Sequence, residues 1–487
     1  PTALSGEPRQ AYRDGELTVF TLAELLADLA PGVRLEGADG LQIRRACVDS
    51  RECAPQALFA ALVGERTDGH RYVDAALGAG AVAALVDRPA MLSPERREGA
   101  IDIVNQRAPA RAEPPAVVVV PSVLAALQRL AQGRRRAHPE MRVVGVTGSV
   151  GKTTTKEMVA AVLGRRFDTH KTDRNLNNEL GVPWTLLRLD DGHQVSVVEM
   201  GISDFGEMRR LTAMVRPDIA VFSVIGDAHL EFLGDRAGVL RAKSEIFEGM
   251  SEGGLAVLNG DDEYLRNCRP NMRRVTYGRG ADCDVRAEDV ENLGMEGIRL
   301  TIRHTGGAFP ARIPAFGSHT VYAALAAAAV GLELGLTGEE IAAGIADYHT
   351  VGDRARVIRT RDMTVVSDCY NANPNSVGAA LDSLSQLQGR RVAILGDMLE
   401  LGAQTEALHF GVGERAAKQG IDLTIGCGDL ARHIAEGARA AGGEAMYYPD
   451  KAALIDALPG ILRPGDSVLV KASLTMAFKD VVDALVK

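Results

Sequence analysis

The sequence has few aromatic residues and no excess of positive charge. Phe, Trp and Tyr make up 4% of its 487 residues, and the formal net charge is -9 at pH 7. Nucleic acids attract basic surfaces, and the sequence has no basic stripe. We therefore expect no nucleic acid among its partners.

Long apolar runs are also missing from the sequence. No stretch approaches the roughly 20 residues of a membrane-spanning helix. The N-terminal segment PTALSGEPRQ is polar and has no apolar signal-peptide core. We expect a cytoplasmic protein without membrane insertion, and a monomer is the default expectation.

Cysteines are scarce and widely spaced. The six of them form no C-x-x-C pair and stand at Cys47, Cys53, Cys268, Cys283, Cys369 and Cys427. This spacing favours free thiols in a reducing compartment over a zinc site or disulfides.

Glycine and aliphatic residues are plentiful. The chain contains 52 glycines, and 46% of its residues are hydrophobic. This composition is typical of alternating α/β architecture. At about 150 residues per domain, a chain of this length suggests about three domains.

Residues 142–158, RVVGVTGSVGKTTTKEM, are the most informative stretch. The apolar run Val143–Val146 predicts a buried strand, and Lys152 opens a predicted helix that continues to about Leu163. The turn between them is rich in small residues. This order is the context of a phosphate-binding loop, in which backbone N–H groups and the helix N-terminus face a polyphosphate.

The spacing of this loop departs by one residue from the general pattern, because Val146 stands where the first glycine is usual and Gly145 precedes it. We still predict binding of ATP or GTP. Lys152 can reach the outer phosphates, and the Thr153 hydroxyl can hold Mg²⁺. The nucleotide-binding residues predicted here are Thr147, Gly148, Ser149, Val150, Gly151, Lys152, Thr153 and Thr154.

Polar residues follow the next predicted strands, where open α/β sheets bind their ligands. Glu199 ends one strand and is a candidate Mg²⁺ ligand, His229 follows the next, and Asn259 ends a third. Asn177 and Asn178 belong to a run with three asparagines in four positions, which offers many hydrogen-bonding groups to a polar ligand.

The predicted organisation is a small N-terminal α/β domain (1–135), a central domain (136–348) and a C-terminal domain (349–487). The central domain combines a parallel sheet with short antiparallel strands near residues 279–314. The C-terminal domain alternates strands and helices like a dinucleotide-binding fold, but it lacks G-x-G-x-x-G, so NAD is not expected. The charged stretch Arg134–Pro139 predicts a linker.

Several stretches together resemble the Mur ligases of peptidoglycan synthesis over nearly the whole chain. These are GVTGSVGKT at 145–153, NLNNELGVP at 175–183, IGDAHLE at 225–231, the run around Lys243, and YNANP at 370–374. The resemblance implies that UDP-sugar, ATP and acceptor dipeptide bind to the first, second and third domains. It also implies ATP-dependent joining of D-alanyl-D-alanine to UDP-N-acetylmuramoyl-tripeptide through an acyl phosphate.

The resemblance also implies roles for single residues. Lys152, Glu199, His229 and Lys243 would be catalytic, and Mg²⁺ would be held by Thr153 and Glu199 and, at a second position, by His229 and Lys243. Lys243 would be carbamylated. Asn259 would lie near adenine and Arg354 near the phosphates. The substrate residues would be Ser50, Arg51, Asn177, Asn178, Asp368, Asn371 and Asn373.

The sequence departs from the family pattern in two places. Ala323 stands where an asparagine is usual, and the C-terminal K-G-S-R motif reads Lys471-Ala472-Ser473-Leu474. The first change weakens a contact to adenine, and the second removes a cation near the dipeptide.

Three alternatives are weaker than this reading. A sister Mur ligase or a folylpolyglutamate-type ligase would use another acceptor, and the two asparagine-rich motifs disfavour both. A P-loop regulatory ATPase would hydrolyse nucleotide without an amine acceptor. The sequence leaves open whether the third residue of the tripeptide is lysine or meso-diaminopimelate.

Overall fold

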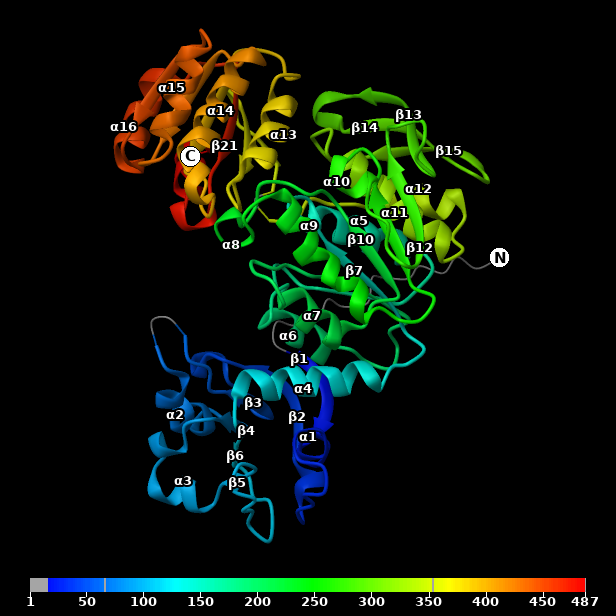
Figure 1. Cartoon of the computed structure of the whole chain (residues 1–487). Coiled ribbons are helices and arrows are strands. Elements are labelled where there is room, and N and C mark those ends of the chain that lie inside the picture. Colours follow the sequence, from blue (N-terminus) through cyan, green and yellow to red (C-terminus); the bar gives the residue numbers. More distant parts are fainter. Residues whose placement is uncertain (1–15, 65–66, 353, 487) are drawn as a thin grey trace. The chain divides into compact units, whose positions relative to one another are not determined.

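The computed structural model describes residues 16–64, 67–352 and 354–486 (Figure 1). The segment PTALSGEPRQ and two positions of the predicted N-terminal domain, 65 and 66, lie outside these residues. Within the described ranges, no helix has both the length and the apolar character needed to cross a membrane.

The chain forms two compact units that contain three sheets in total. The first unit comprises Pro1–Met141 with Glu179–His193 and Ala213–Val215, and the second comprises Arg142–Asn178, Gln194–Thr212 and Arg216–Lys487. One sheet lies in the first unit and two lie in the second. The predicted division into the three domains 1–135, 136–348 and 349–487 stays a prediction.

The first unit is built on a six-stranded sheet with the order β1-β2-β3-β4-β6-β5. Only the β1–β2 pair is antiparallel. The strands are β1 (Glu16–Thr21), β2 (Gln42–Cys47), β3 (Ala57–Ala60), β4 (Ala81–Val86), β5 (Ile101–Asp102) and β6 (Ala116–Val119). The helices are α1 (Leu22–Leu29), α2 (Val73–Gly78), α3 (Pro94–Glu98), α4 (Val123–Arg136) and α6 (Gly181–Leu187).

Helix α6 belongs to the first unit although its sequence lies far along the chain. Leu187 is part of the hydrophobic core beside α1 and α4, and the half-buried Trp184 packs against the same core. The only tryptophan of the protein therefore reports on the first unit.

The linker predicted at residues 134–139 is partly wrong, because α4 continues to Arg136. Arg135 is buried in its last turn, and its guanidinium donates to the carbonyls of Val215 (3.1 Å) and His138 (2.8 Å). The Arg135 charge, which suggested a solvated linker, is thus satisfied by hydrogen bonds inside the fold.

The prediction of free thiols is wrong for one pair of cysteines. Cys47 ends β2, Cys53 follows a short 3₁₀ turn, and the two form a disulfide with their Cα atoms 6.0 Å apart. The turn reverses the chain within six residues and brings the pair to bonding distance. The two cysteines do not form a C-x-x-C motif, so their spacing did not predict this disulfide. Cys268, Cys283 and Cys427 are free thiols.

The central part of the second unit is a nine-stranded sheet with the order β15-β14-β13-β12-β11-β10-β7-β9-β8. It is parallel except for β13–β14–β15, which confirms the predicted antiparallel addition. The strands are β7 (Arg142–Thr147), β8 (Thr169–Lys171), β9 (Val195–Glu199), β10 (Ile219–Phe222), β11 (Leu255–Asn259), β12 (Arg273–Gly278), β13 (Val285–Asn292), β14 (Ile298–His304) and β15 (Gly307–Ile313).

Helices of this part include two that are buried against the sheet. The alanine-rich α11 (Thr320–Glu333) packs with α5 (Lys152–Leu163) in one continuous core. The remaining helices are α7 (Glu207–Val215), α8 (Leu230–Leu233), α9 (Arg236–Ser244), α10 (Glu263–Arg266) and α12 (Gly338–Ala346).

The last sheet has six strands in the order β16-β17-β21-β18-β19-β20, parallel except for β16–β17. Its strands are β16 (Arg356–Arg359), β17 (Thr364–Asp368), β18 (Arg391–Gly396), β19 (Leu423–Cys427), β20 (Ala445–Tyr448) and β21 (Ser467–Lys471). Its helices are α13 (Pro374–Leu384), α14 (Thr405–Lys418), α15 (Arg432–Ala440), α16 (Lys451–Ile461) and α17 (Lys479–Val486). The predicted α/β fold class is thus confirmed.

Candidate active site

The glycine-rich loop connects β7 to α5 as the sequence predicts. Gly148 and Gly151 adopt left-handed backbone conformations, with φ of 142° and 83°. A Cβ atom on Gly148 would lie 2.0 Å from the Ser223 hydroxyl, so only glycine fits there. Helix α5 begins directly after the loop at Lys152.

Lys152 lies over the loop. Its Nζ donates to the carbonyl oxygens of Gly148 (2.8 Å) and Ser149 (3.4 Å). Burial lowers the pKa of Lys152, while the Glu199 carboxylate opposes this shift and Arg354 adds to it. A cation above a loop of backbone N–H groups is suited to bind a polyphosphate.

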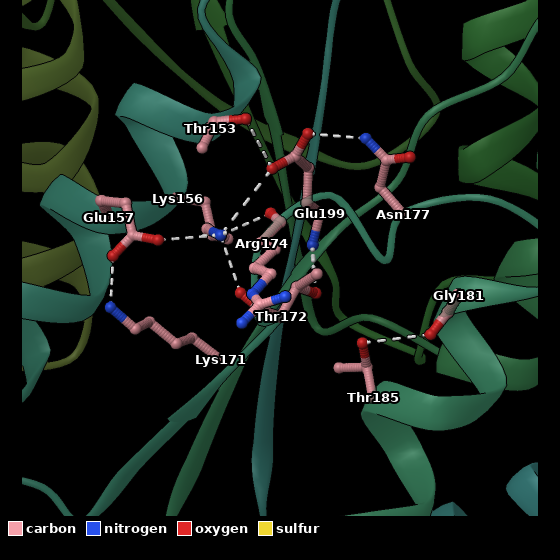
Figure 2. A network of polar contacts seen from close by, with 10 residues as sticks. All are labelled: Thr153, Lys156, Glu157, Lys171, Thr172, Arg174, Asn177, Gly181, Thr185 and Glu199. Atoms are coloured by element: carbon pink, nitrogen blue, oxygen red, sulfur yellow. Dashed lines mark hydrogen bonds and ion pairs between the residues drawn. The ribbon is translucent and has the colours of Figure 1, made fainter. Parts of the chain in front are cut away.

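Glu199, at the end of β9, is buried and held by two neutral donors (Figure 2). The Thr153 hydroxyl donates to Oε2 (2.9 Å), and the Asn177 amide donates to Oε1 (2.7 Å). A hydroxyl and a carboxylate at the start of a P-loop helix are oxygen ligands that Mg²⁺ accepts. Three of the predicted residues thus meet at one point.

Few further metal ligands surround this point. Across the described ranges, no group of three or more His, Cys, Asp or Glu side chains is arranged to hold a metal ion. Mg²⁺ at phosphate sites commonly takes one or two carboxylates and completes its shell with phosphate oxygens and waters. Thr153 and Glu199 therefore fit such a site.

His229 and Lys243 are buried to different degrees, and both interact electrostatically with Lys152. Lys243, on α9, is 1% exposed, and its Nζ has no hydrogen-bond partner among the described residues. Burial and the nearby Lys152 ammonium hold the pKa of Lys243 well below its usual value. An unpartnered buried amine with this pKa shift is a candidate functional group.

His229 precedes α8, and its Nδ1 lies 2.6 Å from the Glu400 carboxylate. Both residues have left-handed backbones, with φ of 56° and 61°, which is uncommon outside glycine and often marks functional sites. Burial lowers the pKa of His229. Glu400 opposes this shift, and Lys152 and Lys243 add to it. A neutral imidazole is the form that binds metals.

A pocket of about 500 Å³ collects most of the predicted nucleotide and acceptor residues. The predicted residues in its lining are Ser149, Val150, Gly151, Lys152, Thr153, Thr154, Asn177, Glu199, Asn259, Arg354, Asp368, Asn371 and Asn373. Its lining, as far as the chain is described, does not include Thr147, Gly148, Asn178, His229 or Lys243.

Several predicted residues have structural contacts of their own. Asn259 donates to the Ser223 carbonyl (2.9 Å) and accepts from Asp261 N–H (3.1 Å). Asn373 is the N-cap of α13, where its side chain accepts from Ser376 N–H (2.9 Å). These contacts fix the two side chains at the pocket wall.

Ser50 and Arg51 belong to the first unit. They lie in the short turn after β2, and the Asp49 side chain accepts from both the backbone N–H and the guanidinium Nε of Arg51 (2.9 Å each). Arg51 lowers the pKa of Asp49 to about 2.

Sequence reasoning missed Lys471 and Tyr370, which line the pocket, and Lys156, which is not among the described lining residues. Lys471 contacts Asp368 (2.6 Å) and Asn371 (2.8 Å), and the Arg354 guanidinium lies 3.8 Å from the Tyr370 ring centre. Both Lys471 and Tyr370 stand within motifs that the sequence singled out, which was an available signal. Lys156, one turn after Lys152, had none, because it reads as an ordinary helix lysine.

Models of Mur ligase domains match most of the chain. The Mur ligase family, catalytic domain, matches residues 42–135, the Mur ligase middle domain matches 146–331, and the Mur ligase glutamate ligase domain matches 333–474. These three ranges follow the order of the three sheets.

Individual relatives are similar over nearly their full length. The UDP-N-acetylmuramoyl-tripeptide–D-alanyl-D-alanine ligases of Bacillus subtilis and Escherichia coli are each 36% identical, over 96% of this chain and 98% of theirs. Among solved structures, MurF from Acinetobacter baumannii aligns with a TM-score of 0.84 at 30% identity, covering 97% of this chain and 99% of its own. MurF from Thermotoga maritima in complex with ADP aligns with a TM-score of 0.76 at 27% identity, covering 91% and 96%. The chain therefore belongs to the Mur ligase family.

Proposed function

We propose that the protein joins D-alanyl-D-alanine to UDP-N-acetylmuramoyl-tripeptide with cleavage of ATP to ADP and phosphate. The observation that carries this proposal is 36% identity, over 96% of the chain, to two ligases named for this reaction. The P-loop geometry and the pocket of about 500 Å³ that residues of this loop line support it from the structure. The reaction would take place in the cytoplasm, as a step of peptidoglycan precursor synthesis.

The first chemical step in this proposal is phosphoryl transfer to the tripeptide carboxylate. Two anions must approach each other, so positive charge has to offset their repulsion. Lys152 supplies such charge beside the loop. Thr153 and Glu199 would hold Mg²⁺, which when bound supplies further positive charge along the phosphates.

The second step is attack by the dipeptide amine on the resulting acyl phosphate, with phosphate as the leaving group. Asp368 and Asn371 would lie near the acceptor, and Lys471 fixes both by contacts of 2.6 Å and 2.8 Å. Asn373 holds the start of α13 beside them. Asn177 would orient the carboxyl donor near Glu199.

The remaining predicted roles are part of the same proposal. Ser50 and Arg51 would contact the uridine diphosphate, Asn178 the sugar-peptide substrate, Asn259 the adenine and Arg354 the phosphates. The domains 1–135, 136–348 and 349–487 would bind UDP-sugar, ATP and acceptor. Lys243, as a carbamate, and His229 would serve a second Mg²⁺.

The test is phosphate release from ATP and Mg²⁺ with the two substrates added separately and together. We expect release only with both substrates, together with a pentapeptide product of the expected mass. Release without the dipeptide would instead support a regulatory ATPase, and release with another acceptor would support a sister ligase. Parallel assays with lysine- and diaminopimelate-containing tripeptides identify the third residue.

A further inference from the structure

We propose that Lys156 is a positioning residue for this reaction. Its buried ammonium holds Glu199, and the segment that leads to Asn177, in place beneath the P-loop helix. The proposal rests on the proposed function for its chemistry, but its geometry stands on contacts of the free protein.

Lys156 is fully buried and its ammonium reaches four groups on three elements (Figure 2). Nζ donates to the carbonyl oxygens of Thr172 (2.7 Å) and Arg174 (3.4 Å). It lies 2.8 Å from Glu157 Oε1 and 3.9 Å from Glu199 Oε2. The side chain therefore links α5 to the end of β9 and to the segment after β8.

The cost of burying this charge points to a role beyond filling space. An ammonium loses its hydration in the interior and requires paired charges and hydrogen bonds in return. Glu157 supplies part of this compensation and is shared with Lys171. An aliphatic side chain would fill the same space without desolvating a charge, so a positional function explains the lysine better.

The contacts of Lys156 continue directly to the candidate Mg²⁺ ligand. The Thr172 hydroxyl accepts from Glu199 N–H (3.0 Å), and Thr172 N–H donates to the Val197 carbonyl (3.0 Å). Lys156 thus fixes Glu199 in two ways, through charge on its carboxylate and through Thr172 on its backbone. Contacts that hold a metal ligand from behind in this way orient it towards the metal.

The same ammonium fixes the path of the chain towards Asn177. It binds the carbonyls on both sides of Asp173, and Arg174 then takes a left-handed conformation with φ of 46°. Three residues later, Asn177 returns to donate to Glu199 (2.7 Å). Without Lys156, this segment and the carboxylate would lose their common anchor.

The test compares Lys156→Met with Lys171→Met. Both lysines contact Glu157, but only Lys156 approaches Glu199, and Lys171 is 44% exposed. We expect Lys156→Met to raise the half-saturating Mg²⁺ concentration and to lower kcat, each by about 10-fold or more, as for loss of an outer-shell partner. The KM for D-alanyl-D-alanine should change by less than about twofold, because the acceptor residues do not contact Lys156. Lys171→Met should match the wild type.

Two further measurements do not depend on turnover. Calorimetric titration of a non-hydrolysable ATP analogue at several Mg²⁺ concentrations should show the same shift in Mg²⁺ dependence for Lys156→Met. Hydrogen exchange without metal should be faster across residues 172–178 in this variant than in Lys171→Met.

In Lys156→Met, Glu157 keeps its contact with Lys171 but loses that with Lys156. The double variant Lys156→Met/Glu157→Gln also removes the Glu157 charge, so it provides a second variant for the test if the single variant does not fold. The proposal is overturned if this folded double variant binds the analogue with wild-type Mg²⁺ dependence, or if both lysine variants behave alike. If the wild type shows no ligase turnover, the proposed function fails, whereas binding and exchange still decide the role of Lys156.

Discussion

At the scale of single residues, Lys243 illustrates how burial changes the chemistry of an amine. In the sequence it stands in a charged helical stretch and looks like a solvated lysine. In the structure it is 1% exposed, and burial together with Lys152 holds its pKa well below its usual value. A larger neutral fraction at pH 7 makes the amine a better nucleophile, as carbamylation by CO₂ requires.

The loss of activity in a Lys243→Ala variant should therefore be partly reversed by a small added carboxylate. We expect Lys243→Ala to lower kcat by about 100-fold, in the range seen for loss of groups that support a metal site. Acetate or propionate added to the assay should restore part of the activity by replacing the carbamate. A Lys243→Ala variant with full activity and no added carboxylate would contradict carbamylation.

Thr153 is a second residue whose predicted role, as a Mg²⁺ ligand, can be tested by substitution. Its hydroxyl contacts Glu199 at 2.9 Å. We expect Thr153→Val to raise the Mg²⁺ requirement by about 10-fold and Thr153→Ser to stay near the wild type, because only the hydroxyl is a ligand. Mg²⁺ titration of initial rates measures this, and equal effects of both variants would argue against ligation by Thr153.

At the scale of elements, the N-cap residue of α13 combines a structural contact with a predicted role in binding the acceptor. Asn373 lies in the predicted acceptor site and also caps the helix in a reciprocal arrangement with Ser376 (2.9 Å and 3.1 Å). A helix that begins at the pocket wall requires its first N–H groups to be satisfied.

Capping and ligand binding can be separated at this position. Asn373→Ala should lower the free energy of unfolding by about 1 kcal/mol, the usual loss of an N-cap. Asn373→Asp should keep this stability, because aspartate caps equally well. Urea unfolding measures both variants. If Asn373→Asp is stable but has a raised KM for the dipeptide, the amide also serves the substrate.

Helix α14 is tied to the loop after β18 by a buried histidine. His409 Nε2 accepts from Met398 N–H (2.9 Å), so this nitrogen has to be unprotonated, and Nδ1 lies 2.7 Å from the Thr405 carbonyl. Burial lowers the pKa of His409, although Thr405 and Asp397 oppose the shift and His433 adds to it.

The lowered pKa of His409 determines whether the free energy of unfolding rises or falls with pH. The unfolded histidine, with a pKa of about 6.5, binds protons more readily than the folded one. The stabilisation is therefore complete above about pH 6.5 and is lost as the pH falls below it. Between about pH 7.5 and 5.5, the free energy of unfolding should fall more for the wild type than for His409→Gln in urea unfolding. Equal losses would exclude this linkage.

At the scale of the whole molecule, the two compact units have separate hydrophobic cores. The core around α1, α4 and α6 includes the half-buried Trp184, whereas the nucleotide pocket is lined by residues of the second unit. Tryptophan fluorescence therefore reports on one unit, and the proposed nucleotide site lies in the other.

A ligand should shift only one of these signals. A non-hydrolysable ATP analogue with Mg²⁺, at about 100 times its Kd, should stabilise the second unit by about 2.7 kcal/mol. Thermal unfolding followed by circular dichroism should shift upward, while the transition seen by Trp184 fluorescence should stay within about 1 °C. A coincident shift of both signals would show that the chain unfolds as one cooperative unit.

The sequence by itself determined the elements whose signals are local. The P-loop strand and α5 were predicted at Val143–Val146 and Lys152–Leu163, and the structure has β7 and α5 there. Apolar runs and small-residue turns are short-range patterns, so neighbours along the chain suffice to recognise them. The same holds for Glu199 at the end of β9. Helix α16 has a weaker local signal, because Pro459 lies within it.

Tertiary structure alone decided which distant residues share an environment. Lys156 and Lys243 have the local sequence of surface lysines, yet contacts from other elements bury both. The assignment of α6 to the first unit likewise depends on a core formed with α1 and α4. Burial and pairing arise from packing between segments far apart in sequence, and the physical effects that follow, such as the lowered pKa of Lys243, exist only once that packing forms.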